Sequence, residues 1–244
     1  MVSSLQPARA QSGGLVTVFG GSGFLGRHVV RELARRGWRV RAAVRRPDLA
    51  GHLQPMGAVG QIHAVQANLR FPESVARAVA GSDAIVNCVG ILQPAGHQTF
   101  DEVHVEGAHA IAKAARAAGI GNLVHVSALG SDKDSPSTYA VTKAKGEDDV
   151  LEEVPSAVIL RPSVVFGPED EFFNRFAAMA TRSPALPAVG GGKTRFQPVF
   201  VGDVALAVAN ALEGKAKPGT VYELGGPEVE SMRELLERVA RMTG

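Results

Sequence analysis

The chain has 244 residues, of which 45% are hydrophobic and 20% charged, and its 26 Lys and Arg residues nearly balance 24 Asp and Glu residues. A disordered chain is excluded, because the apolar fraction is high and the formal net charge of +2 is small. The single cysteine, Cys88, excludes an internal disulfide framework and a multi-cysteine metal site. No apolar run approaches the ~18 residues that span a bilayer, so we expect a cytoplasmic protein without direct membrane insertion.

The N-terminal residues 1–14 (MVSSLQPARAQSGG) lack the apolar stretch of a secretory signal. We expect them to form a flexible tail. Because they contain one Arg and no acid, a transit peptide is the alternative.

Beyond the tail, short apolar runs alternate with segments of helical periodicity. Strands are predicted at 15–19, 40–44, 62–66, 84–89, 123–127, 157–160 and 221–224. Helices are predicted at 24–36, 73–80, 100–118, 138–153 and 203–212. Several strands are continuous apolar runs, which are typical of a parallel sheet buried on both faces under crossover helices. The alternation predicts an α/β fold with a Rossmann-type doubly wound parallel sheet.

After residue 161 the chain becomes rich in Gly, Pro and Phe, with one predicted helix at 169–181. Loops of this kind usually belong to a substrate lobe or a lid. The last predicted helix, 231–242, starts at Ser231 as N-cap with Glu234 three residues later. Nothing follows against which this helix could pack, so truncation is a further expectation. The predicted division is a tail at 1–14, a dinucleotide-binding domain at 15–165 completed by about 200–225, and a small C-terminal lobe formed by 166–199 and 226–244.

A glycine-rich turn follows the first predicted strand. Gly20, Gly23 and Gly26 have the spacing GxxGxxG, and Gly21 with the last two gives GxGxxG. Glycine is needed at such a turn because the backbone takes positive φ, approaches a pyrophosphate closely and packs the helix on the strand. The helix N-terminus then offers free N–H groups to the phosphates. In this context the motif predicts a dinucleotide site.

The end of the second predicted strand indicates which dinucleotide is bound. NAD sites usually place an acid about 20 residues after the glycines to bind the ribose 2′-hydroxyl, but no acid occurs between Glu32 and Asp48. Arg45 and Arg46 lie there instead, and a guanidinium can bind a 2′-phosphate in bidentate fashion. NADP(H) is therefore predicted, with NAD(H) as the alternative. A nucleic-acid partner is not expected, because the chain is nearly neutral and only 5% aromatic.

The segment HVSALGSDKDSPSTYAVTKAKGE carries the candidate catalytic pair. Tyr139 and Lys143 stand four residues apart at the start of a predicted helix, so their side chains share one face. An ammonium beside a phenol lowers the tyrosine pKa, and Tyr139 could then exchange a proton with a carbonyl or an alcohol while a hydride moves. Lys143 would also reach the ribose hydroxyls of the nucleotide.

Together these motifs resemble those of the short-chain dehydrogenase/reductase superfamily, on its extended or atypical side. The resemblance rests on the glycine turn, YAVTK, NLVHVSALG, LRPSVVFGPED and FQPVFVGDVALAV, and it spans about residues 15–226. More narrowly, GGSGFLGRHVV, NCVGIL, VHVEGA and QPVFVGDVA are similar to the nucleotide-binding accessory subunit of respiratory complex I and its bacterial relatives. The narrower resemblance implies complex I subunits as partners and a peripheral place at the inner membrane through that complex.

The resemblance implies a role for each matching position. Tyr139 and Lys143 match the catalytic pair, with Ser127 as the candidate for the accompanying hydroxyl. Arg45 and Arg46 would bind the 2′-phosphate. The other positions implied to contact the nucleotide are Gly20, Ser22, Gly23, Phe24, Leu25 and Gly26 around the pyrophosphate, Asn68 beside the adenine, Cys88, Val89 and Gly90 over the nucleotide, Lys143 at the ribose, and Pro162 and Val164 beside the nicotinamide.

Two positions depart from the family pattern. Active relatives usually have a second hydroxyl after the fifth strand, often in a Ser-Ser pair, whereas Ser127 is followed by Ala128. Losing that hydrogen bond would cost about 2–4 kcal/mol of barrier lowering, by analogy with oxyanion-hole deletions, unless Ser127 or Ser131 substitutes. His104 stands where relatives commonly have Asn, and we expect a satisfied core histidine and no metal site.

Two functions are consistent with these observations. The first is an accessory or assembly protein that holds NADP(H) as a structural cofactor, which the complex I resemblance and the missing hydroxyl favour. The second is an active NADP-dependent reductase or dehydrogenase, or a nucleotide-sugar epimerase, that uses Tyr139 and Lys143. The first is preferred, because the lobe offers few polar groups for a sugar diphosphate. The best available are Lys193, Thr194 and Arg195.

Overall fold

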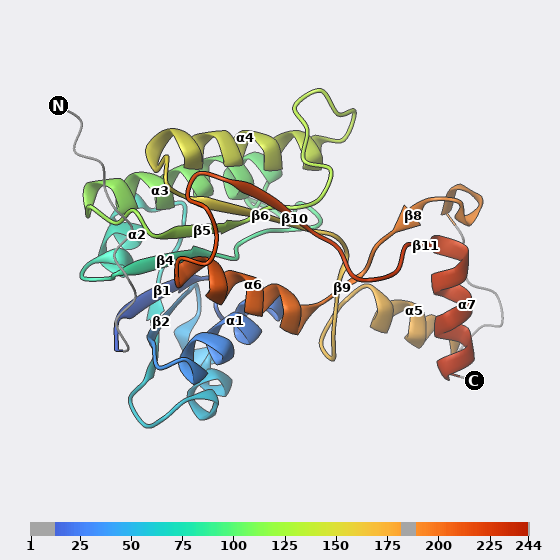
Figure 1. The fold of residues 1–244 in the computed structure, drawn as a ribbon, viewed down its shortest axis with the longest axis horizontal. Coiled ribbons are helices and arrows are strands. Elements are labelled where there is room, and N and C mark those ends of the chain that lie inside the picture. Colours follow the sequence, from blue (N-terminus) through green and yellow to red (C-terminus); the bar gives the residue numbers. More distant parts are fainter. Residues whose placement is uncertain (1–12, 182–188, 244) are drawn as a thin grey trace.

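Seven strands form one parallel sheet at the centre of the molecule (Figure 1). The computed structural model describes residues 13–181 and 189–243, so the predicted tail lies outside the described residues except for its last two glycines. The sheet order is β3-β2-β1-β4-β5-β6-β10, and all neighbouring strands are parallel. The prediction of a Rossmann-type doubly wound sheet is confirmed. The strands are β1 (Leu15–Phe19), β2 (Arg39–Val44), β3 (Ile62–Gln66), β4 (Ala84–Asn87), β5 (Leu123–Val126), β6 (Val158–Pro162) and β10 (Val221–Leu224).

Helices cover both faces of this sheet (Figure 1). The helices α1 (Phe24–Arg35) and α6 (Val201–Leu212) pack together on one face. The other face is covered by α2 (Pro72–Val79), α3 (Gly107–Ala117) and α4 (Thr138–Glu153). Each face therefore has its own hydrophobic core, one under α1 and α6 and one under α2, α3 and α4.

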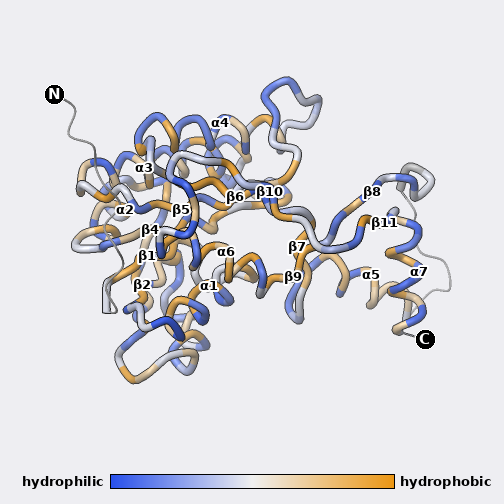
Figure 2. Tube along the Cα trace, viewed as in Figure 1, coloured by the Kyte–Doolittle hydropathy of each residue, from blue (hydrophilic) through white to orange (hydrophobic). Residues whose placement is uncertain are grey.

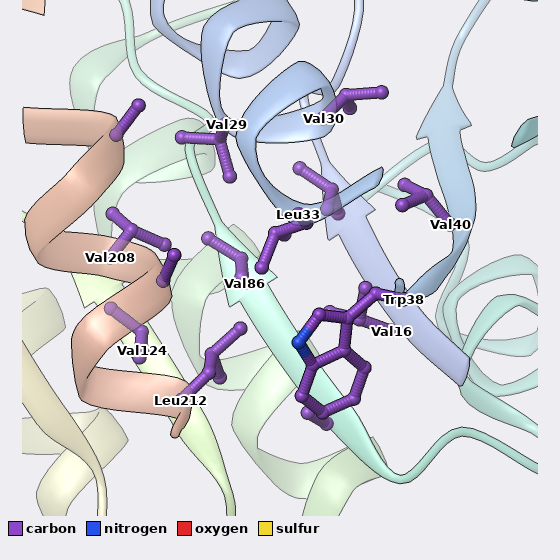
Figure 3. Packing of buried hydrophobic residues seen from close by; sticks show 14 of the residues in the cluster. Val16, Val29, Val30, Leu33, Trp38, Val40, Val86, Val124, Val208 and Leu212 are labelled. Atoms are coloured by element: carbon purple, nitrogen blue, oxygen red, sulfur yellow. The ribbon is translucent and has the colours of Figure 1, made fainter. Parts of the chain in front are cut away.

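Strand β1 shows how the apolar runs of the sequence build both cores. Val16 packs in the first core with Leu33 of α1 and Trp38 (Figure 3), whereas Phe19 belongs to the second core. Because successive side chains of a strand point to opposite faces, a strand covered on both sides needs apolar residues at nearly every position. Figure 2 shows the hydrophobic residues concentrated in the central strands and in α6.

One predicted helix, 100–118, consists of two elements in the structure. A π-helical turn covers Asp101–Glu106, and α3 follows it directly. The prediction of one continuous α-helix is wrong here, because a π turn changes the backbone hydrogen bonds while the apolar pattern continues. Two 3-10 turns, Pro47–Leu49 and Gly51–Met56, connect β2 to β3.

A small lobe follows β6 and lies beyond the carboxyl ends of the strands (Figure 1). Six phenylalanines pack against one another around its helix α5, with ring centroids 5.0–6.1 Å apart. They are Phe166, Phe172, Phe173, Phe176, Phe196 and Phe200. The elements of the lobe are β7 (Val165–Phe166) paired with β9 (Val199–Phe200), β8 (Arg195–Phe196) paired with β11 (Glu230–Ser231), α5 (Phe173–Ala180), a 3-10 turn (Val189–Gly192) and α7 (Met232–Thr243).

Local capping explains where the two lobe helices begin. The Asp170 carboxylate accepts the Phe173 backbone N–H at 2.5 Å, so α5 starts later than the predicted 169–181. At α7, Ser231 Oγ accepts the Glu234 N–H at 3.3 Å and the Glu234 carboxylate accepts the Ser231 N–H at 2.7 Å. This reciprocal cap confirms the predicted role of both residues. Over the described residues, no helix has the length and apolar character needed to cross a membrane.

Candidate functional site

The turn between β1 and α1 has the geometry that a pyrophosphate site requires. Gly20 has a φ of +73°, which favours glycine. A Cβ at Gly26 would lie 2.1 Å from the Gly20 carbonyl oxygen, so only glycine lets α1 pack on this turn. Gly23 is the N-cap of α1, and no described side chain caps the helix there. The first amides of α1 are therefore available to an anion, and the turn fits a nucleotide pyrophosphate.

A cavity of about 310 Å³ lies beside this turn, at the carboxyl ends of β1, β2, β3 and β4. Its size suits a small ligand, and its position is where doubly wound sheets bind nucleotides. The predicted contact residues that line it are Gly20, Ser22, Gly23, Arg45, Asn68, Cys88, Val89 and Gly90. The predicted residues outside its lining are Phe24, Leu25, Gly26, Arg46, Ser127, Tyr139, Lys143, Pro162 and Val164.

Several lining residues were not predicted from the sequence. Arg70 lies two residues after Asn68 in the loop that follows β3, and the rule that ligands bind at strand carboxyl ends could have found it. Four more come from the connection between β4 and α3, where a bridge joins Ala95 to Gln98. They are His97, Gln98, Glu102 and Val103. The remaining unpredicted lining residues lie at or just after the strand ends and are Phe19, Ala43, Val44, Ala67, Leu69 and Ile91. No pattern in the sequence places His97 and Gln98 at the cavity, and the predicted helix 100–118 contains Glu102 and Val103 without indicating that they line it.

Arg45 and Arg46 follow β2 but have different surroundings. Arg45 is exposed and lines the cavity. Arg46 donates to Asp48 through Nη2 at 2.8 Å and through Nε at 3.1 Å, and this hydrogen-bonded carboxylate raises the pKa of the guanidinium. Of the two arginines, only Arg45 thus lines the cavity, and its contact with a 2′-phosphate stays a prediction.

Asn68 and Cys88 belong to opposite walls of the cavity. Asn68 Oδ1 accepts the Arg70 backbone N–H at 3.2 Å, which fixes the amide just after β3. Burial raises the pKa of the Cys88 thiol to about 12. Cys88 is therefore a protonated, weakly polar part of the wall just after β4.

Helix α4 carries Tyr139 and Lys143 one turn apart on the same face. Lys143 is buried, and its Nζ donates to the Val126 carbonyl oxygen at 3.0 Å. Burial lowers the pKa of Lys143 to about 8, although the Glu147 carboxylate opposes this shift. Burial also raises the pKa of Tyr139, so the expectation that a neighbouring ammonium lowers it is wrong for this structure.

The pair lies behind the wall of the cavity. The Tyr139 ring meets His104 and Phe100 edge-on, with centroids 5.3 and 5.7 Å away. A Cβ at Gly90, a residue of the cavity wall, would lie 3.9 Å from Lys143 Nζ. This position is compatible with contact to a bound nucleotide, and the catalytic roles of Tyr139 and Lys143 stay predictions.

The hydroxyls that follow β5 belong to a buried network. Ser127 Oγ donates to Glu147 Oε1 and lies 3.1 Å from Ser131 Oγ. Ser131 Oγ donates to the Ala128 carbonyl oxygen at 2.7 Å. Glu147, which no sequence motif singled out, is also paired with Arg161 at 2.6 Å between Nη2 and Oε2. A catalytic role for Ser127 stays a prediction.

Pro162 and Val164 lie where the sheet passes into the lobe. Pro162 is the last residue of β6, and its carbonyl oxygen accepts the Leu129 N–H at 2.9 Å. The Val164 carbonyl oxygen accepts the Val199 N–H at 3.0 Å, which ties the lobe strand β9 to this end of the sheet. Their predicted contact with a nicotinamide is compatible with this place and stays a prediction.

Comparison with solved structures supports the same fold. The chain superimposes with a TM-score of 0.80 on a dTDP-glucose 4,6-dehydratase double mutant (DesIV) from Streptomyces venezuelae, which holds NAD and DAU. The two share 25% sequence identity, and the match covers 93% of this chain and 80% of that one.

Two curated relatives are similar over most of the chain. The mitochondrial NADH dehydrogenase (ubiquinone) 1 alpha subcomplex subunit 9 of Arabidopsis thaliana is 37% identical over 93% of this chain. This chain spans only 57% of that relative's length. A 2-alkyl-3-oxoalkanoate reductase of Stenotrophomonas maltophilia is 33% identical over 94% of this chain and 76% of its own.

Residues 16–225 match the model of the NAD dependent epimerase/dehydratase family. This range contains the glycine turn, the paired Tyr139 and Lys143 and nearly all of the seven-stranded sheet. The match agrees with the resemblance found from the motifs. The chain belongs to the NAD dependent epimerase/dehydratase family.

Proposed function

We propose that this chain is an NADP(H)-binding accessory or assembly protein of respiratory complex I, and that it holds its nucleotide as a structural component. The relative named as an NADH dehydrogenase subunit is similar over nearly the whole chain, which supports this role. A partner of that kind would keep the chain at the periphery of the inner membrane.

The residues present suit a dinucleotide. The first amides of α1 and the Gly20–Gly23 turn would hold the pyrophosphate, and Asn68 would contact the adenine. Cys88 and Gly90 would close the opposite wall. When bound, a nicotinamide nucleotide supplies or accepts a hydride. The side chains around it provide its binding, its orientation and the electrostatic environment.

Two arginines of the cavity wall support NADP(H) over NAD(H). Arg45 follows β2 and Arg70 follows β3, and both line the cavity. These loops are neighbours, because Ala67 N–H donates to the Val44 carbonyl oxygen at 2.9 Å between the two strands. A dianionic 2′-phosphate would be attracted by two guanidinium groups, whereas a ribose hydroxyl gains little from them.

The engaged hydroxyls after β5 carry the proposal of a structural nucleotide. The Ser127 hydroxyl donates to Glu147, a carboxylate that is paired with Arg161. The Ser131 proton is directed to the Ala128 carbonyl oxygen. Because Ala128 has no hydroxyl, residues 127–131 have no hydroxyl proton left to polarise a substrate carbonyl. Turnover would therefore be slow even with a nucleotide in place.

The identity and exchange of the nucleotide test this function. The purified protein is denatured, the released nucleotide is identified, and its replacement by labelled NADPH is timed. We expect co-purified NADPH that exchanges over hours. Exchange within seconds would contradict a structural role and would fit a reductase or dehydrogenase, because net reduction or oxidation of a substrate requires the spent cofactor to leave at each turnover. Co-purified NADH would contradict the assignment of Arg45.

An active NADP-dependent reductase or dehydrogenase, or a nucleotide-sugar epimerase, is the second candidate. It is favoured by the pair on α4, since a lysine with its pKa lowered to about 8 is poised near neutral pH. Tyr139 would exchange a proton with the substrate oxygen, and Lys143 would hold the ribose hydroxyls. Similarity to a relative named as a reductase is compatible with this chemistry.

The variant Tyr139→Phe separates the two functions. Under the second function we expect the loss of any NADPH-dependent reduction, with the Kd for NADPH changed by less than about twofold. Thr138→Val, one residue earlier in the same turn, is the matched control and should leave the rate unchanged. Reduction that survives Tyr139→Phe would exclude Tyr139 as the proton donor.

A further inference from the structure

His104 connects the wall of the nucleotide cavity to the helix that carries the catalytic pair. It lies in the π-helical turn before α3 and is buried, with 2% of its surface exposed. Its Nε2 faces the Ile91 backbone N–H at 3.2 Å, and Ile91 lines the cavity. Its Nδ1 lies 3.1 Å from Thr142 Oγ1 on α4. One imidazole thus bridges two elements that are far apart in the sequence.

The contacts of His104 determine which nitrogen carries its proton. A backbone N–H can only donate, so Nε2 must be the acceptor and a neutral ring must carry its proton on Nδ1. Nδ1–H then donates to Thr142 Oγ1, and the Thr142 hydroxyl donates to the Thr138 carbonyl oxygen at 2.9 Å. Burial, aided by the Lys143 charge, lowers the pKa of His104 to about 4, which keeps the ring neutral near pH 7. The hydrogen bonds therefore run in one direction from the cavity wall to the first turn of α4.

The backbone of this turn is also held against α4. A Cβ at Gly146 would lie 2.0 Å from the His104 carbonyl oxygen, so the glycine lets the helix approach the turn closely. On the other side of the ring, a Cβ at Gly90 would lie 3.9 Å from both His104 Nε2 and Lys143 Nζ. The Tyr139 ring packs edge-on against the same imidazole. The histidine therefore touches the cavity wall on one side and the Tyr139–Lys143 face on the other.

We propose that His104 is a positioning residue. Its ring forms a directed series of hydrogen bonds that holds the Gly90–Ile91 wall of the nucleotide cavity against helix α4. Loss of the ring would free the Ile91 N–H and let the wall move relative to Tyr139 and Lys143. The nucleotide would then be released faster. This inference rests on the proposed binding of a nicotinamide nucleotide.

Two variants test this connection through the release rate of NADPH. The rate is measured by displacing bound, labelled NADPH with an excess of unlabelled NADPH. His104→Leu fills the space of the ring with an apolar side chain but leaves the Ile91 N–H without its acceptor, and we expect release about tenfold faster. His104→Gln has a side chain long enough to place an amide oxygen near the former Nε2, where it can accept from the Ile91 N–H, and we expect it to restore release to within about threefold of wild type.

A substitution in the second core separates positioning from general destabilisation. Ile111 is buried in α3, away from the cavity lining, and Ile111→Ala should lower the free energy of unfolding by about 2–5 kcal/mol without changing the release rate. Unchanged release in His104→Leu, or equally faster release in Ile111→Ala, would overturn the inference. If neither NADPH nor NADH binds the wild-type protein, the proposed function fails together with it.

The proton on Nδ1 gives a second measurement that needs no variant. Imidazole nitrogen chemical shifts of the wild-type protein should show a neutral His104 protonated at Nδ1 near pH 7. If His104→Leu does not fold, Thr142→Val removes the hydroxyl that accepts from Nδ1 on α4, and it should also accelerate release of NADPH. A proton found on Nε2 would overturn the inference, because the Ile91 N–H would then face a second donor.

Discussion

Arg45 and Arg46 are adjacent in the sequence, yet their guanidinium groups face different partners. Arg45 lines the nucleotide cavity, and Arg46 donates twice to Asp48. We expect Arg45→Ala to raise the Kd for NADPH about 10- to 100-fold, because it removes a charge-assisted contact to the 2′-phosphate. The Kd for NADH should change by less than about threefold. Isothermal titration with both nucleotides measures the difference.

Arg46→Ala is the matched control for this prediction. It removes the same charge one residue away, but from a group already paired with Asp48. We expect it to change the Kd for NADPH by less than about threefold. Equal losses in the two variants would show that the overall charge of the loop, not a contact by Arg45, sets the preference.

At the scale of residues, the sequence predicts the parts of the site whose chemistry is local. The glycine turn could be predicted because the spacing of its glycines, over seven residues, by itself indicates the backbone geometry of the turn. The partners of Ser127 and His104 could not, because Glu147 and Ile91 reach them only through tertiary packing. The pKa of Tyr139 was misjudged for the same reason, since its burial outweighs the effect expected from Lys143.

Helices α1 and α6 are joined by one arginine at the edge of the first core. Arg36 Nη1 lies 2.7 Å from Glu213 Oε2 and 3.0 Å from Asn210 Oδ1, and its Nε lies 2.8 Å from Glu32 Oε1. Its side chain is only 18% exposed. We expect Arg36→Ala to lower the free energy of unfolding by about 1–2 kcal/mol, measured by urea denaturation, because Glu32 loses its donor and Glu213 and Asn210 keep only their contacts with Lys215.

The neighbouring Arg35 offers the control for this element. It is exposed and has no ion pair within the part of the chain that the structure describes. Arg35→Ala should therefore change the free energy of unfolding by less than about 0.5 kcal/mol. A loss as large as that of Arg36→Ala would mean that helix propensity or net charge, not the contact between α1 and α6, accounts for the effect.

At the scale of elements, prediction succeeded where the apolar pattern of the sequence matches the period of the backbone conformation. All seven sheet strands were predicted. Burial on both faces explains the apolar pattern of the inner strands, whereas the edge strands β3 and β10 are partly exposed. The π turn at Asp101–Glu106 was missed, since one extra residue in a turn leaves no mark on the pattern. The late start of α5 was also missed, because it depends on Asp170 reaching the Phe173 N–H.

At the scale of the whole molecule, the sheet brings together loops that are far apart in the chain. The cavity is built from the ends of β1, β2, β3 and β4, which lie side by side in the order β3-β2-β1-β4 and are all parallel. A parallel sheet could therefore be predicted to gather these loops at one edge. The loop that carries His97 could not be placed, because it has neither periodicity nor a turn motif, and the helical pattern that contains Glu102 does not show that this residue reaches the cavity.

Two buried histidines next to Lys143 link the stability of the whole fold to pH. Burial, with a smaller effect from Lys143, lowers the pKa of His104 to about 4 and that of His125 well below its usual value. An unfolded chain titrates histidine near pH 6.5. Between pH 6.5 and 4 the unfolded state therefore binds protons that the folded state does not, and the free energy of unfolding falls as the pH falls.

For His104 alone this loss amounts to about 3 kcal/mol on going from pH 7 to pH 4. Urea denaturation at pH 7.5, 6.5, 5.5 and 4.5 measures it, and His104→Asn removes the titrating group while keeping a donor and an acceptor. We expect the variant to lose less stability than the wild type across this window, so that their curves converge as the pH falls. Parallel curves would mean that His104 takes up its proton in the folded state, and the ring would then lose its bond to Ile91 without unfolding the protein.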